Sequence, residues 1–97
     1  MQLATVLGQV VSTIKKPGLE RFTLLVVQDT KDGDPGRTSG DPYVAVDLVG
    51  AGTGEVVLVT GGSAARVAAG PDTPIDCAVV AIADSVIREG DVTYRKA

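Results

Sequence analysis

The chain has 97 residues, a formal net charge of −3 and only three aromatic side chains. This composition gives no sign of the basic surface that binds a nucleic-acid phosphate backbone. The single cysteine, Cys77, excludes an internal disulfide framework, and the absence of histidine removes the usual proton carrier at neutral pH. Met1 is followed by neither a basic segment nor a long apolar run. We therefore expect one cytoplasmic domain over residues 1–97, with no signal peptide and no transmembrane helix.

The first part of the chain is predicted to form two strands and a loop. Residues 2–14 favour a strand with a bulge or a sharp bend at Gly8, because a glycine inside a strand often marks one or the other. A Pro-Gly pair at 17–18 predicts a turn, and the apolar run 22–28 predicts a second strand that is covered on both faces. Residues 29–42 are dense in Gly, Pro and Asp, so we expect a polar, mobile loop.

The middle of the chain places one strand between two glycine-rich joints. Residues 43–47 and 56–59 predict the third and fourth strands, and a hinge with glycines at alternate positions of 50–54 separates them. After the second joint, Ser63 is predicted to cap a short helical turn over residues 64–69, which a Gly-Pro pair ends.

The last part of the chain contains its longest apolar run. Residues 75–87 are predicted to form one strand buried on both faces, residues 88–91 a turn and residues 92–94 a final short strand. The fold class is therefore all-β, a small OB-like barrel of five to six strands, partly open, with one short helical turn. Because several strands are apolar on both faces, we expect an identical subunit to cover one outer face.

The residue types give little support to an enzyme. Cys77 opens an apolar strand with no histidine to activate it, so a buried structural thiol is the better interpretation. The serines lack a general base, and no two carboxylates are spaced as an acid and base pair. The aspartates within 29–34 lack the glutamate that ends a calcium-binding loop, which favours a solvated turn. We predict no catalytic, cofactor or metal site.

The two glycine joints could each be interpreted as an anion site. The hinge reads G-x-G-x-G and precedes a strand, whereas the dinucleotide fingerprint has a different glycine spacing and precedes a helix. The second joint, G-G-S-A-A-R, is a better anion nest, since amides at a helix start and Arg66 would attract a carboxylate or phosphate. We favour the alternative that Arg66 pairs with a carboxylate of its own chain or of a neighbour.

Three motifs occur in order along the chain: D-L-V-G-A-G-T-G-E-V-V-L-V at 47–59, G-S-A-A-R at 62–66 and P-I-D-C-A-V-V-A-I-A-D at 74–84. Together with V-L-G-Q-V-V-S-T at 6–13, they resemble the vertex proteins of bacterial microcompartments, the family of the carboxysome and ethanolamine-compartment pentamers. Residues 29–42 match no pattern of that family.

The resemblance implies a small barrel of OB type, five copies of which form a ring that closes the corners of a polyhedral protein shell in the cytoplasm. The implied partners are the chain itself, as a homopentamer, and hexameric shell proteins, with no nucleic acid and no membrane. A ring of this kind needs a head-to-tail interface that closes on itself. We expect the two glycine joints to supply the oligomer or shell contacts, through Val49, Gly50, Ala51, Gly52, Gly54, Glu55, Gly62, Ser63, Ala64, Ala65 and Arg66.

Two other functions remain open from the residues alone. An OB-type module could bind single-stranded nucleic acid, and Lys15, Lys16 and Arg21 form the basic patch that favours it. A co-chaperonin-like ring has a similar length and all-β character, but residues 29–42 lack the apolar motif that a docking loop needs.

Overall fold

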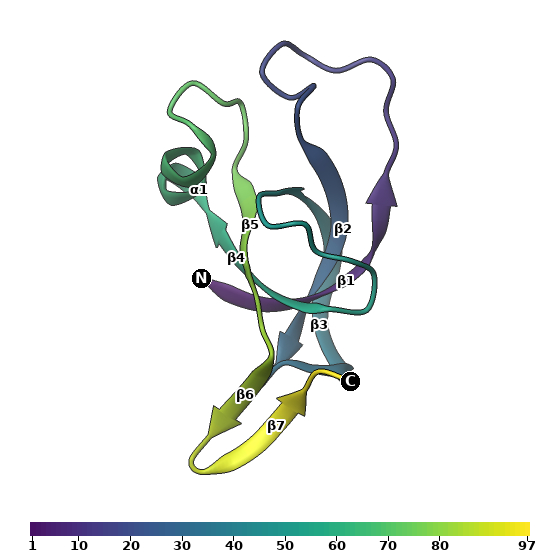
Figure 1. The fold of residues 1–97 in the computed structure, drawn as a ribbon, viewed down its shortest axis with the longest axis vertical. Helices are drawn as coiled ribbons and strands as arrows, with labels where there is room; N and C mark the ends of the chain where they lie inside the picture. The colour runs from purple at the N-terminus through teal and green to yellow at the C-terminus, as the bar shows by residue number, and fades with distance from the viewer.

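Five strands close into a barrel in the computed structural model, which describes all of residues 1–97 (Figure 1). Around the barrel, the order is β1 (Gln2–Val10), β2 (Thr23–Lys31), β3 (Asp34–Asp47), β5 (Cys77–Ile82) and β4 (Val56–Gly61), which pairs with β1 again. Every pairing is antiparallel except that of β3 with β5. The predicted all-β barrel is confirmed, although it is closed rather than partly open.

The remaining elements lie outside the barrel. Helix α1 (Gly62–Ala69) connects β4 to β5 and lies on one flank (Figure 1). Strands β6 (Ser85–Arg88) and β7 (Asp91–Arg95) form a separate hairpin that projects beyond one end of the barrel. The chain thus has seven strands instead of five or six, and a helix of eight residues instead of a single turn. This helix is far too short to cross a lipid bilayer.

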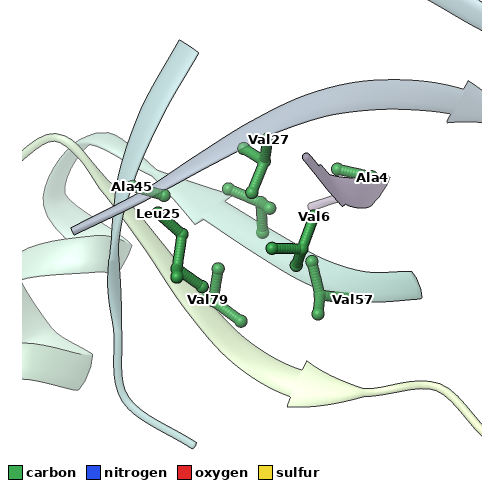
Figure 2. Packing of buried hydrophobic residues seen from close by; sticks show 8 residues of the cluster. Ala4, Val6, Leu25, Val27, Ala45, Val57 and Val79 are labelled. Carbon is green, nitrogen blue, oxygen red and sulfur yellow. The ribbon is translucent and has the colours of Figure 1, made fainter. Parts of the chain in front are cut away.

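The barrel interior is filled mainly by valine (Figure 2). Leu25 and Val27 alternate along β2 and meet Val6 of β1, Val57 of β4 and Val79 of β5. Each of these four valines is at most 1% exposed. Full burial of one valine contributes roughly 1.5–3 kcal/mol, so this cluster supplies much of the driving force for closure.

The barrel closes through a short seam between β3 and β5. These parallel strands pair only at Val46 with Ala78 and at Asp47 with Val79. Ala65 of α1 is completely buried against Val46 and Ala78. The small side chains let the helix approach the seam closely, and the helix in turn covers the residues that make the closing contact.

The expectation of a mobile loop over residues 29–42 is wrong. Strands β2 and β3 extend through this segment and pair down to Lys31 with Asp34. The turn between them contains Asp32 and Gly33, whose φ angles of 54° and 75° are the left-handed values that a two-residue hairpin turn needs. An Asp-Gly pair is a strong hairpin signal, and the polar composition reflects only that the side chains of residues 35–42 are exposed.

Three further boundaries differ from the sequence expectations. The first strand ends at Val10, with its predicted bulge at Gly8 present as a register shift, and residues 11–14 pair with no strand. Ser63 does not cap the helix, because α1 begins at Gly62, two residues earlier than predicted, and the Gly62 amide donates to the Asp76 carbonyl at 2.8 Å.

The predicted strand over residues 75–87 is split in two. Strand β5 ends at Ile82 because its partner β4 begins at Val56, which accepts a last hydrogen bond from the Ala83 amide at 2.8 Å. The chain then bends away from the barrel and continues as β6. The predicted turn at 88–91 and the final strand are confirmed.

The projecting hairpin is fixed to the β2–β3 turn. Gly33 is buried under Val86 of β6, and Arg88 makes an ion pair with Asp32 through Nη1, at 2.9 Å from Oδ2. The Thr93 hydroxyl donates to the Asp32 carbonyl at 2.6 Å. Since a two-stranded hairpin is at best marginally stable alone, these contacts hold it in place.

A substitution at Gly33 tests this docking. An alanine Cβ would lie 2.8 Å from Val86 Cγ2 and 3.3 Å from Tyr94 Cβ, at a φ of 75°. We expect Gly33→Ala to lower the free energy of unfolding by roughly 2–4 kcal/mol, from overpacking and backbone strain together. Gly40→Ala is the control, because φ there is 71° with no atom within 4 Å, and it should cost only about 1–2 kcal/mol. Both variants are measured by urea denaturation at one protein concentration. Equal decreases in the free energy of unfolding for Gly33→Ala and Gly40→Ala would contradict the docking of the hairpin.

Candidate oligomerisation surface

The hinge loop, residues 48–55, is held in one conformation by the carboxylate that precedes it. Asp47 Oδ1 accepts the amides of Val49 and Gly50 at 3.1 and 3.0 Å, and Oδ2 accepts the amide of Ala51 at 3.0 Å. Gly50 adopts a φ of 82°, which lets the loop curl back over the carboxylate. The amides that could have held an external anion are therefore already satisfied within the chain.

The second half of the loop is fastened in the same way. Glu55 Oε1 accepts the Gly52 amide at 2.6 Å, and the Gly54 amide donates to the Val6 carbonyl at 2.8 Å. Glu55 also forms an ion pair with Lys96, next to the C-terminal residue. The hydrogen bond from Lys96 and that from the Gly52 amide hold the pKa of Glu55 below its ordinary value. The loop thus presents a rigid surface, with Val49 exposed on it.

Helix α1 presents the other predicted joint. Ser63, Ala64 and Arg66 are exposed, and Val67, which follows them in the helix, is 79% exposed. Ala65 points inward and is fully buried, so its contribution is to the fold of its own chain. The Arg66 side chain makes no ion pair within the chain, where the two ion pairs are Arg88–Asp32 and Lys96–Glu55. The expected pairing of Arg66 with a carboxylate of its own chain is therefore absent, and its pairing with a carboxylate of a neighbour stays a prediction.

The structure separates the two joints. Strand β4 runs between them, so the glycines of the hinge loop and the exposed face of α1 lie on opposite flanks of the barrel (Figure 1). Motifs that are neighbours in the sequence therefore form two different surfaces and not one pocket. Two different surfaces on opposite flanks are what a head-to-tail contact between identical subunits requires.

Other groups considered from the sequence form no reactive arrangement. Burial and the nearby Asp76 raise the pKa of the Cys77 thiol, which favours the unreactive protonated form. The Tyr43 hydroxyl donates to Asp29 Oδ1 at 2.6 Å, and burial together with that hydrogen bond raises its pKa. No three or more Cys, Asp or Glu side chains gather as a metal site. These polar groups stabilise the barrel wall.

The basic patch that favoured nucleic-acid binding is directed at its own chain. Lys15 Nζ donates to the Phe22 carbonyl at 3.0 Å, and Arg21 Nη2 donates to the Ala69 carbonyl at 3.1 Å. The Arg21 guanidinium also stacks over the Phe22 ring, 4.7 Å from its centre. Lys15 and Arg21, two of the three cations of the patch, are thus engaged in packing the loop before β2. The Phe22 ring, which could have stacked on a base, is engaged there as well.

Comparison with known proteins places these surfaces in a family. The family model for "Ethanolamine utilisation protein EutN/carboxysome" matches residues 1–84. The chain belongs to this family. The match includes the barrel, the hinge loop and α1, and it ends just before the β6–β7 hairpin.

Individual members of the EutN/carboxysome family resemble the chain over its whole length. The microcompartment shell vertex protein EutN of Escherichia coli K12 is 44% identical over 98 residues, covering 99% of this chain and 100% of EutN. A solved EutN structure superposes with a TM-score of 0.91 at 41% identity, with full coverage of both chains. The pentameric microcompartment shell protein GrpN of Rhodospirillum rubrum gives a TM-score of 0.80 at 43% identity, covering 91% of this chain and 99% of GrpN. These relatives are structural shell proteins, which points to a non-enzymatic role.

That Asp47 and Lys96 hold the hinge loop was not predicted from the sequence. An aspartate followed by several small residues often accepts their amides, so a signal for Asp47 was available. Nothing in the sequence connects Lys96 with Glu55, because 41 positions separate them and only the path of the C-terminal hairpin brings them together.

The Lys96–Glu55 contact predicts a pH dependence. A carboxyl group whose pKa is lowered on folding contributes stability that is complete above its unfolded pKa and is lost as pH falls through the folded pKa. Lys96→Met should therefore raise the pKa of Glu55 towards its ordinary value and weaken the acid dependence of stability. Carboxyl NMR titration measures this directly. Lys31→Met, which removes an exposed lysine without an ion pair, should leave the Glu55 pKa unchanged.

Proposed function

We propose that this chain forms a homopentameric ring that closes the five-fold vertices of a polyhedral microcompartment shell in the cytoplasm, surrounded by hexameric shell proteins. The observation that carries the proposal is the family membership, together with the similarity to the pentameric shell protein GrpN over nearly its whole length. Relatives named as shell vertex proteins in several bacteria support the position at the vertex.

The geometry of the two glycine joints supports a ring. A closed ring needs two different, complementary surfaces on each subunit. The hinge loop on one flank is rigid and rich in glycine, and α1 on the opposite flank exposes Val67 and an unpaired Arg66 (Figure 1). We assign the contact between neighbours to these surfaces: Val49, Gly50, Ala51, Gly52, Gly54 and Glu55 of one copy, facing Gly62, Ser63, Ala64 and Arg66 of the next.

Rigidity of the loop favours such an interface. A flexible loop would lose conformational entropy on association, whereas the hydrogen bonds to Asp47 and Glu55 have already fixed this one within the monomer. Exposed glycines at the contact also allow the backbone of a neighbour to approach closely.

The first test is the native mass of the purified protein. A ring of five should weigh about five times the 9.9 kDa of one chain and should resist dilution, as an extensive obligate interface does. Native mass spectrometry over a hundredfold range of concentration measures this. A stable monomer would overturn the ring, and a closed ring of another size would favour a function outside the shell vertex.

Gly52→Val tests the assignment of the hinge loop. The backbone at Gly52 is outside the left-handed region, and an added Cβ would meet only Glu55 Oε1, at 3.4 Å. The monomer should therefore fold, while the two extra methyl groups obstruct a neighbour and reduce ring formation at least tenfold. Gly36→Val is a matched control at an exposed position near the start of β3, where the Cβ would lie 3.3 Å from Asp34 Oδ1. Intact rings for both variants would remove the hinge loop from the interface.

A further inference from the structure

Residues 11–14 have a sequence suited to a strand but no strand partner. The segment V-S-T-I contains three β-branched residues and continues directly from β1, which nevertheless ends at Val10. Ile14 is 90% exposed, the highest value among the large apolar residues, and Val11 is 83% exposed, as much as Met1. A conflict between local sequence and isolated fold often marks a functional surface. This segment has the character of an element whose partner lies outside the chain.

An apolar groove lies at the same end of the molecule. It has a volume of about 220 Å³ and is lined by Leu19, Leu24, Val44, Ile75 and Cys77, among others. The groove exists because β3 and β5 pair only from Val46 onwards. Before that residue, β3 has no strand partner on its β5 side, and the chain at Pro74–Asp76 forms the opposite wall.

The segment and the groove are placed as a ring requires. The segment after β1 and the chain leading into β5, which forms one wall of the groove, both lie at the end of the barrel away from the β6–β7 hairpin (Figure 1). The segment leaves β1 on the flank that carries the hinge loop, whereas the chain leading into β5, which walls the groove, is on the flank that carries α1 (Figure 1). The two halves of a contact in a closed ring lie on different sides of the subunit, and these two segments lie on different sides at the same end of the barrel.

Charge is complementary across the same pair of surfaces. Lys16 follows the segment, is exposed and makes no ion pair within the chain. Asp76 lies at the groove, is exposed and likewise makes no ion pair within the chain. Opposite charges at the rim of an interface favour one register and one partner over others.

We propose that residues 11–14 of one copy occupy the groove of the neighbouring copy, with Lys16 beside the neighbour's Asp76 position. The occupant is a second copy of this chain. The proposal rests on the ring of the preceding section and adds a second contact to the one assigned to the hinge loop and α1, continuous with it on the same two flanks.

The direct test places lysines on the segment. In Val11→Lys/Ile14→Lys, both changes are at exposed positions, so the monomer should keep its circular dichroism spectrum and its barrel. Native mass spectrometry should show at least a tenfold loss of the ring. Ile87→Lys/Val92→Lys is the matched control, with apolar side chains 65% and 46% exposed on the projecting hairpin, and should retain the ring. A ring that forms equally well in the segment variant overturns the proposal while leaving the ring itself established. A monomeric wild-type protein overturns the ring and the docking together.

A cross-linking test locates the contact. Cys77 is the only cysteine of the chain and lines the groove. Ile14→Cys and Val11→Cys, each oxidised under mild conditions, bring a second thiol to the proposed site. At least one of them should give covalent oligomers of up to five chains on non-reducing electrophoresis, lost on reduction. Ile87→Cys should give no such ladder. If neither segment variant is cross-linked more than this control, residues 11–14 do not dock in the groove.

Discussion

The two-residue seam between β3 and β5 is the constraint on which the rest of the structure depends. It closes the barrel with only Val46–Ala78 and Asp47–Val79 in register, and it requires Ala65 of the helix to fill the space beside it. Because the seam is short, β3 diverges from β5 on one side and leaves an apolar groove. On the other side, Asp47 is the last residue of β3, and its carboxylate accepts hydrogen bonds from amides of the hinge loop. The closure of the barrel, the apolar groove and the start of the hinge loop therefore all depend on the short seam between β3 and β5.

The hinge loop shows how a glycine-rich segment can be rigid. Gly50 and Gly54 adopt φ angles of 82° and 89°, which few other residues would tolerate, and carboxylates at both ends of the loop accept its amides. In a nucleotide-binding loop, such amides remain free for phosphate. Here Asp47 and Glu55 occupy them, so the same residue type that makes a ligand site elsewhere makes a fixed surface for a neighbouring protein.

The distribution of contact surfaces is consistent with an assembly function. No three or more Cys, Asp or Glu side chains gather as a metal site, and exposed apolar residues lie on several surfaces, among them the segment after β1, the hinge loop, α1 and the projecting hairpin. A subunit of a closed ring needs complementary surfaces on two flanks, and a subunit of a shell also needs contacts outside its ring. The β6–β7 hairpin extends beyond the barrel and lies outside the residues that match the family model, and Lys96, which follows β7, joins its base to Glu55 of the hinge loop.

The amino-acid sequence by itself determined the all-β class, the bulge at Gly8, the hinge, the position of the helix and the last turn, because these follow from local periodicity, glycine placement and turn chemistry. The motifs also carried the resemblance to the vertex family. The tertiary structure decided the features that join distant residues. Polar residues 34–42 became part of a strand because β2 satisfies their backbone, and the run at 75–87 was divided because β4 offers no partner beyond Val56. The separation of the two glycine joints onto opposite flanks was decided in the same way, since only the path of β4 through the closed barrel sets their positions in space.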